Sequence, residues 1–182
     1  MKNHILSAVR LTFVMFVIIG IYLGIVYAGS KILPTHGKAE IIHYKGQKFY
    51  ANIGQKFTSS KYFHGRPSAV DYNAAGSGGS NKGPSNKEYL QTVQKRINAL
   101  KIQNPDMENV KIPVELVTAS GSGLDPDISE NGAFYQVKRI AKMRNISVEK
   151  VENLIKNQTE TSFFGPSKVN VLQLNIALDQ LK

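Results

Sequence analysis

The sequence predicts an α/β protein with one N-terminal transmembrane helix followed by a single mixed α/β soluble domain. Three observations predict this fold. An apolar run without charged residues fills positions 11–30. The remaining 152 residues (182 − 30) suffice for one hydrophobic core and are too few for two. Apolar residues in that remainder recur mostly at helical spacings, with a few strand-like segments between them.

The apolar run reads LTFVMFVIIGIYLGIVYAGS and spans roughly 30 Å as a helix, which matches a hydrocarbon core. Gly20 and Gly24 form a G-x-x-x-G spacing that lets another helix pack closely. A cleaved signal peptide has a shorter apolar region and a small-x-small site, so an uncleaved anchor is favoured. Lysines and arginines flank the run on both sides and do not decide its orientation, but a short leading segment is most easily left in the cytoplasm. We expect a cytoplasmic segment over 1–10, a transmembrane helix over 11–30 and an extracytoplasmic domain over 31–182.

The chain carries a formal net charge of +10 and contains no cysteine. Without cysteine it can form no disulfide, thiolate nucleophile or cysteine-ligated metal site. The charge favours a solvated basic surface beside anionic lipid. Nucleic acid is not an expected partner, because the cations are scattered and no RNP tract or zinc finger is present.

Regular elements are expected at several places in the domain, each from a local pattern. Glycine, serine and asparagine dominate residues 63–86, which we expect to be a long ordered loop. Asp125, followed by Pro126, can cap the helix after the glycine turn at 120–126, and Ser129 is the alternative cap. The expected elements are a hairpin over 39–53 with its turn at 45–47, a helix from a capping box of Ser85 and Glu88 to Leu100 with Leu90 on its apolar stripe, a strand over 112–119, a helical face from Ala133 to Arg144 ending at Asn145, a helix capped by Ser147, and a C-terminal helix with Val171, Leu174, Leu178 and Leu181 on one face.

The glycine-rich segments invite a nucleotide hypothesis, but neither follows a nucleotide motif. The P-loop pattern G-x-x-x-x-G-K-[ST] and the dinucleotide pattern G-x-G-x-x-G both fail at residues 76–83 and 121–126. A glycine turn before a helix could present N–H groups to an anion, although positive φ at a tight corner is the simpler explanation. No G-x-S-x-G elbow is present, and the four histidines lack metal-ligand spacing. We therefore expect no catalytic residues, no metal site and no cofactor bound by a recognisable motif.

Several short motifs stand in order along the chain: FHGRPS at 63–68, YN at 72–73, SGGSN at 77–81, SN at 85–86, VTASGSGLDP at 117–126, YQV at 135–137 with Arg139 and Arg144, VNVL at 169–172 and LN at 174–175. In this order they resemble the C subunit of the potassium-transporting Kdp ATPase of bacteria and archaea. Together with the apolar run they cover nearly the whole chain, although each alone is weak. The chain departs from the family pattern at Asp127, where the family usually has histidine, and at Lys82, where it usually has leucine.

The resemblance implies a non-catalytic, single-pass subunit of the cell membrane that assembles with two larger partners. One partner is a potassium-channel-like subunit, which handles potassium, and the other is a P-type ATPase subunit, which handles ATP. The family description adds a catalytic chaperone role, in which the C subunit promotes ATP binding to the P-type ATPase partner. An extracytoplasmic domain would exert such an effect through the assembled partners.

Two hypotheses of different classes follow. In the first, the two glycine-rich tracts pack together and dock on a partner, with the Arg66 guanidinium clasping Asp71 or Asp125. In the second, the chain is a membrane-anchored hydrolase or binding protein that uses the glycine turn from Ser120 to Asp125. The residues expected to dock on partners or organise the loops are Arg66, Tyr72, Asn73, Ser80, Asn81, Ser120, Ser122, Asp125, Gln136 and Arg139, and those expected to pack in the membrane are Gly20 and Gly24.

Overall fold

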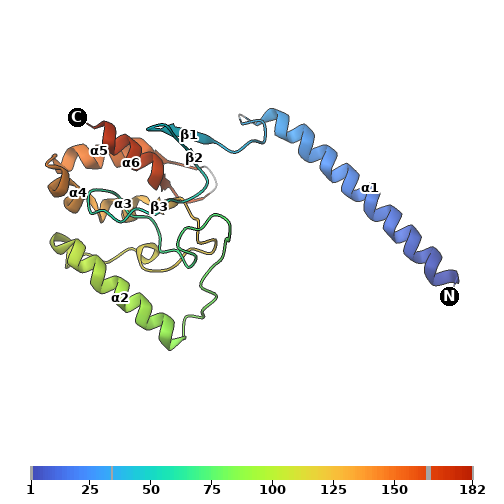
Figure 1. Cartoon of the computed structure of the whole chain (residues 1–182), viewed down its shortest axis with the longest axis horizontal. Coiled ribbons are helices and arrows are strands. Elements are labelled where there is room, and N and C mark those ends of the chain that lie inside the picture. The colour runs from blue at the N-terminus through green and yellow to red at the C-terminus, as the bar shows by residue number, and fades with distance from the viewer. Residues whose placement is uncertain (1, 34, 163–164, 182) are drawn as a thin grey trace. The chain divides into compact units, whose positions relative to one another are not determined.

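The computed structural model describes residues 2–33, 35–162 and 165–181. The chain forms two compact units, residues 1–40 and 41–182 (Figure 1). The first is one long helix with a short following segment, and the second is a mixed domain of helices and short strands. The predicted class, one N-terminal apolar helix before a mixed α/β domain, is therefore confirmed.

The N-terminal helix α1 runs over Lys2–Ile32. Its section His4–Ile32 is long and apolar enough to cross a membrane, and it buries no side chain within the chain. Its last turn is closed by the Ser30 hydroxyl, which donates to the Tyr27 carbonyl at 2.8 Å. Apart from its chain neighbours and the backbone of the helix itself, no described atom lies within 4 Å of a Cβ placed at Gly20 or Gly24, so this face of the helix is open.

A β-hairpin opens the second unit, as predicted. Strands β1 (Ile41–Tyr44) and β2 (Gln47–Tyr50) pair antiparallel. The two turn residues, Lys45 and Gly46, have φ of 48° and 76°. Two successive positive φ values are typical of the two-residue turn that matches the twist of a hairpin.

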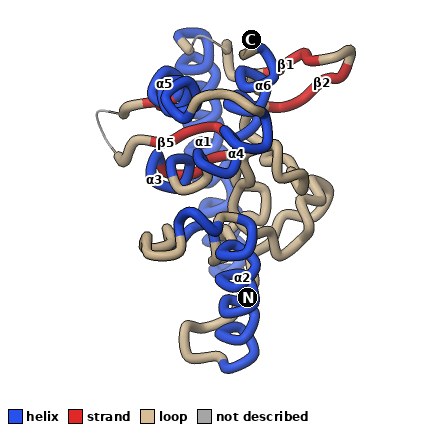
Figure 2. The backbone as a smooth tube through the Cα atoms, turned by 90° about the vertical axis from the view of Figure 1, so that its left-hand side faces the viewer, coloured by secondary structure: helices blue, strands red, loops and turns tan. Residues whose placement is uncertain are grey.

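The second sheet has three very short antiparallel strands in the order β3-β5-β4, drawn in red in Figure 2. They are β3 (Asp127–Ser129), β4 (Thr159–Glu160) and β5 (Lys168–Asn170). The central residues Ile128 and Val169 face each other in the register and are almost fully buried. None of these strands was predicted, because two or three residues are too few to display a period of two.

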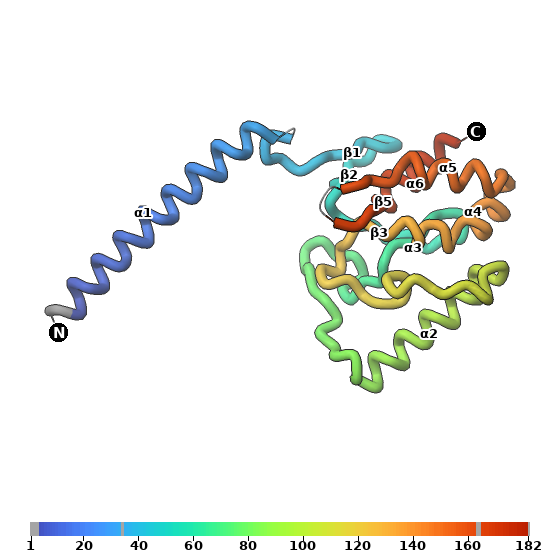
Figure 3. Tube along the Cα trace, turned by 180° about the vertical axis from the view of Figure 1, so that it is seen from behind, coloured from blue at the N-terminus to red at the C-terminus, as the bar shows by residue number. Residues whose placement is uncertain are grey.

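Five helices complete the domain: α2 (Lys87–Gln103), α3 (Glu130–Phe134), α4 (Val137–Arg144), α5 (Val148–Gln158) and α6 (Val171–Gln180), whose arrangement can be followed in Figure 3. The predicted cap Ser147 accepts from the Lys150 N–H at 3.2 Å. The predicted stop Asn145 ends α4 in the left-handed region with φ of 54°. Of the two caps proposed near the glycine turn, Ser129 is the one that caps α3, where its side chain accepts from the Gly132 N–H at 3.0 Å.

The core lies between these helices and the small sheet, and one residue of the long loop enters it. Phe63 is fully buried although it belongs to no regular element. The predicted helical faces supply most of the remainder, whereas Leu90, which was expected on the apolar stripe of α2, is half exposed at 51%. The best-buried members of the cluster are Phe63, Ala133, Ile140, Val151, Ile155, Val169, Leu174 and Leu178.

The strand predicted over residues 112–119 is wrong. This segment holds the 3-10 helix η2 (Val114–Leu116). The neighbours Leu116 and Val117 are both buried, at 6% and 5% exposure. A strand would send these two side chains to opposite faces, whereas a tight turn can bury both. Pro113 fixes φ at −58° and begins the turn.

Two other predicted details shift. Asn86, not Ser85, caps α2, with its side chain accepting from the Tyr89 N–H at 2.9 Å. The helical face from Ala133 to Arg144 belongs to two helices, α3 and α4, separated at Tyr135 and Gln136. A further 3-10 helix, η1 (Pro105–Met107), follows α2.

Candidate docking surface

The two glycine-rich tracts, residues 63–86 and 120–129, lie against each other and together form what we call the loop surface. The Gly78 N–H donates to the Ser122 carbonyl at 2.8 Å. The Ser68 hydroxyl donates to the Gly123 carbonyl at 2.6 Å. The predicted packing of the two tracts is therefore confirmed. Backbone N–H and C=O groups that have no partner within a helix or strand find one here in the other tract.

Gly123 is the residue that permits this close approach. Its φ is +69°, and a Cβ at this position would lie 2.6 Å from the Gly78 carbonyl oxygen and 2.6 Å from a methyl group of Val70. Both the backbone conformation and the space therefore require glycine. Its N–H donates to the buried Ser120 hydroxyl at 3.0 Å, which closes the turn.

The predicted clasp of the loop surface is present. The Arg66 guanidinium contacts the Asp125 carboxylate at 3.1 Å, with both side chains about one quarter exposed (27% and 28%). The second oxygen of Asp125 accepts from the Asp127 N–H at 3.1 Å. The other candidate partner, Asp71, instead pairs with Lys56 at 2.6 Å and is 77% exposed. Of the two proposed partners, Asp125 is the one that holds the guanidinium.

Tyr72 fixes the backbone of Arg66. Its hydroxyl donates to the Arg66 carbonyl. Burial, and then the Asp125 charge, raise the pKa of Tyr72 to about 12, against the lowering effect of Arg66. Its φ of 60° is uncommon for a bulky residue. The surrounding contacts therefore impose a conformation that the residue would not choose alone.

The remaining tract residues present a polar, partly exposed surface. The exposed Asn73 side chain accepts from the Ala75 N–H at 3.0 Å, and the exposed Ser122 hydroxyl accepts from the Leu124 N–H at 3.0 Å. Asn81 is exposed with φ of 51°, and its neighbour Ser80 is half-buried. These contacts are those of ordered turns, and they engage the Ser122 hydroxyl with a backbone donor.

Gln136 and Arg139 belong to a separate, buried cluster that holds the start of the long loop. The Gln136 amide accepts from the His64 N–H at 2.8 Å and donates to the His64 carbonyl at 3.0 Å. Arg139 donates to Asn104 at 3.1 Å, to Gln136 at 2.7 Å and to the Tyr62 carbonyl at 3.0 Å. Both residues are at most 5% exposed, so they organise the loop from the interior of the domain.

Arg139 is unusual because neutral oxygens alone bind its guanidinium among the described residues. Besides Asn104, Gln136 and Tyr62 it contacts the Ser60 carbonyl. Burial lowers the pKa of Arg139 to about 10. Burial of the His64 ring and the nearby charge of Arg139 lower the pKa of His64. A hydrogen bond with the Ser59 carbonyl acts in the opposite direction and raises this pKa.

Two residues on α6 that sequence reasoning did not select also fasten the loop. The buried Asn175 amide accepts from the Phe63 N–H at 2.8 Å and donates to the Phe63 carbonyl at 2.9 Å. Asp179 accepts from Arg144 at 2.7 Å and from Tyr62 at 3.1 Å. The available signal was a polar residue, Asn175, on the apolar face of a helix, where burial requires a partner.

Asp179 also receives hydrogen bonds from the hairpin, from Tyr44 at 2.8 Å and Lys45 at 3.3 Å. Burial by itself raises the pKa of Asp179, but the hydrogen bonds from Arg144, Tyr44, Lys45 and Tyr62 together lower it to about 2. Asp127, which follows the glycine turn, pairs with Lys168 at 2.9 Å.

No group of three histidine, aspartate or glutamate side chains in the described part of the chain is arranged to hold a metal ion.

Beside the clasp, a cavity of about 280 Å³ is lined in part by Lys56, Arg66, Tyr72 and Arg96. The Arg66 Nε atom is buried and has no hydrogen-bond partner among the described residues. The cationic lining and this free donor favour an acidic or carbonyl group.

Comparison with known proteins covers almost the whole chain. The family model described as "KdpC: K+-transporting ATPase, c chain" matches residues 5–180. The chain belongs to the KdpC family.

Curated relatives agree over their full length. A potassium-transporting ATPase KdpC subunit of Flavobacterium johnsoniae is 54% identical over 184 residues, with all of both chains covered. One from Flavobacterium psychrophilum is 52% identical, again over all of both chains. One from Bacteroides fragilis is 42% identical, with 98% of this chain and 97% of the relative covered. As a KdpC-family chain, this protein is a subunit of a potassium-transporting ATPase complex, and its apolar helix fits a single-pass membrane subunit.

Proposed function

We propose that this KdpC-family chain is a non-catalytic assembly subunit, whose loop surface docks on the other subunits of the transport complex. The observation that carries the proposal is the construction of this surface. The two tracts contain no regular element except the three residues of β3, and they are held by bonds between them, by the Arg66–Asp125 clasp and by the buried Gln136 amide, which bonds the His64 backbone. A loop ordered in this way presents polar groups without a large entropy loss on binding.

The partners in this proposal are the potassium-channel-like subunit, which handles potassium, and the P-type ATPase subunit, which handles ATP. The exposed polar side chains Asn73, Asn81 and Ser122 are the first contacts we assign to a partner. The cationic cavity beside Arg66 would receive an acidic or carbonyl group of that partner. Any promotion of ATP binding to the P-type ATPase then passes through the assembled complex as a coupling free energy. We place the domain on the extracytoplasmic side, with residues 1–10 in the cytoplasm.

The hydrolase hypothesis receives less support from the same residues. Ser120 is 3% exposed, and its hydroxyl accepts from the Gly123 N–H. Asp125, the one acidic residue proposed with it, is engaged by Arg66 and by the Asp127 N–H. A nucleophile needs an accessible oxygen with a base in reach, and these contacts commit both side chains to the turn.

A steric block tests the docking surface. Ala74 is exposed in the loop surface, and Asn98 is exposed on α2, so Ala74→Arg and Asn98→Arg add the same bulky cation in two places. We expect Ala74→Arg to reduce co-purification of the full chain with the channel-like and ATPase subunits by tenfold or more, about 1.4 kcal/mol of binding free energy. Asn98→Arg should co-purify normally, and both variants should melt like the unmodified chain.

Normal co-purification of Ala74→Arg would contradict the proposal, because an arginine cannot be accommodated in a closely packed contact. Arg66→Lys provides a second arm. Lysine keeps the charge but loses the planar fork, so we expect weaker assembly together with a nearly unchanged melting temperature.

A further inference from the structure

The β1–β2 hairpin has an outer face whose four side chains are exposed among the described residues. The antiparallel register pairs Ile41 with Tyr50 and His43 with Lys48, so these four side chains lie on one face. All four are exposed, with Ile41 at 42% and Tyr50 at 40%. Lys48 lies over the Tyr50 ring, with its ammonium 5.4 Å from the ring centre.

The opposite face of the hairpin is fixed to the domain. Ile42, Tyr44 and Phe49 are half-buried, and the Tyr44 hydroxyl donates to Asp179 on α6 at 2.8 Å. A cavity of about 260 Å³ between the hairpin and α6 is lined by Tyr44, Phe49 and Asp179 among others. The hairpin is therefore held by one face only, and the other is presented outward.

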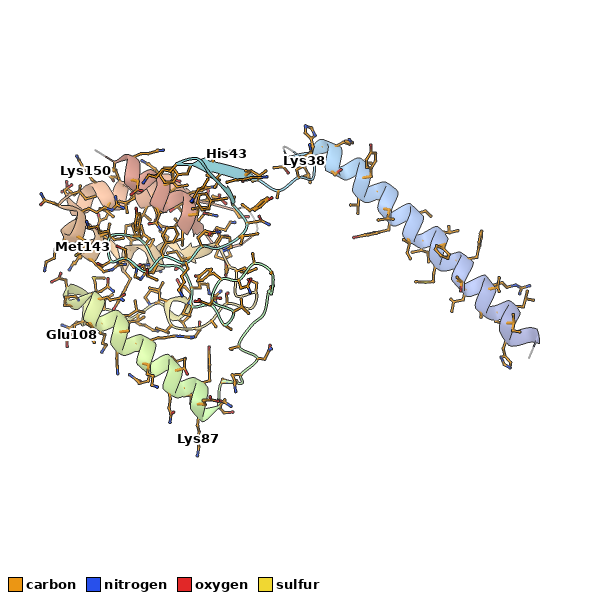
Figure 4. The ribbon with its side chains drawn as sticks, viewed as in Figure 1. Lys38, His43, Lys87, Glu108, Met143 and Lys150 are labelled. Atoms are coloured by element: carbon orange, nitrogen blue, oxygen red, sulfur yellow. The ribbon has the colours of Figure 1, made fainter. Side chains whose placement is uncertain are left out.

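Covalent geometry limits how far the hairpin can lie from the C-terminal end of α1. The helix ends at Ile32 and β1 begins at Ile41, so eight residues, 33–40, connect them. A fully extended chain of that length reaches at most roughly 30 Å. Figure 4 labels Lys38 in this connection and His43 on the hairpin.

The composition of this region matches a membrane–water interface. Residues 31–50 contain four lysines and one glutamate, a formal charge of +3 (4 − 1). An aliphatic residue, a tyrosine and a lysine on one face are the side chains that favour the headgroup level, where an apolar body and a polar tip are both satisfied. Lysines near the surface add attraction to anionic headgroups.

We propose that the outer face of the hairpin, Ile41, His43, Lys48 and Tyr50, lies in the headgroup region of the membrane that α1 crosses and binds anionic lipid. The contact orients the domain at the membrane independently of the loop surface. It requires that α1 spans the bilayer, but it does not depend on which side the domain occupies or on docking by the loop surface.

The absence of cysteine allows single labels to test this on the full chain in lipid nanodiscs. Cysteines for a nitroxide spin label are introduced one at a time at Ile41, Tyr50, Ile18 and Ile102. Ile18 reports on α1, and Ile102, which is 80% exposed on α2, is the matched water-exposed control. Collisions with oxygen, which concentrates in lipid, are compared with collisions with a water-soluble nickel chelate.

We expect labels at 41 and 50 to collide with oxygen in preference to nickel, as the label at 18 does, while the label at 102 shows the reverse. Lys48→Gln should weaken headgroup attraction about fivefold and shift the label at 50 toward water, in discs with phosphatidylglycerol and not in discs of pure phosphatidylcholine. No shift in either lipid would remove anionic lipid as the ligand.

Three outcomes overturn the proposal in different ways. A lipid-exposed label at 18 together with water-exposed labels at 41 and 50 rejects the hairpin contact alone. A water-exposed label at 18 rejects the membrane anchor on which it rests. Labels at 41 and 50 that become shielded from both reagents only after the channel-like and ATPase subunits are added would make this face a protein contact instead.

Discussion

Arg66, which lies in the long loop, and Arg139, which binds the backbone just before that loop, hold the chain in opposite ways. Arg66 is partly exposed and pairs with one carboxylate, that of Asp125. Arg139 is 5% exposed and binds neutral oxygens, three of which are carried by Asn104, Gln136 and Tyr62. A partly exposed ion pair contributes little stability, whereas removing a buried donor that serves several acceptors takes a hydrogen bond from each of them inside the domain.

This difference assigns the two regions different tasks. The buried Arg139 cluster fixes where the loop begins and so is part of what makes the domain fold. The Arg66 clasp fixes the shape of the loop surface but contributes little to the free energy of unfolding. Arg66 also remains accessible to a partner. Substitutions at the two arginines should therefore separate folding from assembly.

The largest expected effect is that of Arg139→Met, which keeps the apolar stem and removes the guanidinium. Because the Ser60 and Tyr62 carbonyls and two side-chain oxygens lose a buried donor, we expect a loss of about 3 kcal/mol in unfolding free energy. The chain has 8 tyrosines and no tryptophan, so near-ultraviolet circular dichroism of the full chain in detergent is the measurement. The neighbouring exposed Lys138→Met is the control, and an Arg139→Met variant as stable as this control would refute the structural role.

Asp179→Asn should come next. The pKa of Asp179 is lowered from 3.8 to about 2, so its contribution is present above the unfolded-state pKa and is lost as the pH falls toward 2. We expect a loss of about 2 kcal/mol at neutral pH, and the gap to the unmodified chain should close between about pH 4 and pH 2. Asp106→Asn, at an exposed aspartate, is the control. A gap that stays constant down to pH 2 would show that the charge of Asp179 is not what stabilises the hairpin.

Arg66→Lys should change the unfolding free energy by less than about 1 kcal/mol, because the pair is partly exposed and lysine keeps the charge. The same variant should assemble poorly, as proposed above. Guanidinium chloride unfolding and co-purification, carried out on one preparation, decide between the two roles. A loss of stability comparable to that of Arg139→Met would make Arg66 a folding residue and end the distinction.

The smallest effect is expected for Asp71→Asn, at less than about 0.5 kcal/mol. Asp71 pairs only with the exposed Lys56 in the described structure and has φ of 53°, which asparagine also tolerates. Normal assembly of this variant is expected too. A marked defect would indicate that Asp71, and not Asp125, engages Arg66 in the complex.

Where the determinants are local, the sequence predicted the structure well. The turn at 45–46, the cap Ser147 and the stop Asn145 each depend on a few adjacent residues. The membrane helix depends only on the apolar run. The packing of the two tracts and the Arg66–Asp125 clasp could be inferred because unpaired backbone groups and a charged fork both require partners.

Other features depended on residues far apart in the chain and could not be predicted. Tyr44 and Asp179, which share a hydrogen bond, are 135 residues apart, and Phe63 and Asn175 are 112 apart. The three-residue strand β5 exists only because β3 and β4 supply its partners. The assignment of Gln136 and Arg139 to a buried cluster likewise required the positions of α4 and the loop.

The sequence by itself thus determined the N-terminal apolar helix, the class of the domain and the ordered polar character of its loops, because each follows from composition or from short-range geometry, and its ordered motifs pointed to the family by resemblance. Tertiary structure alone decided that 112–119 turns instead of extending, that Asp179 joins the hairpin to α6, and which arginine lies inside. These depend on burial, and burial is a property of the assembled chain: a charged or apolar side chain gains its partners only when distant segments bring them together.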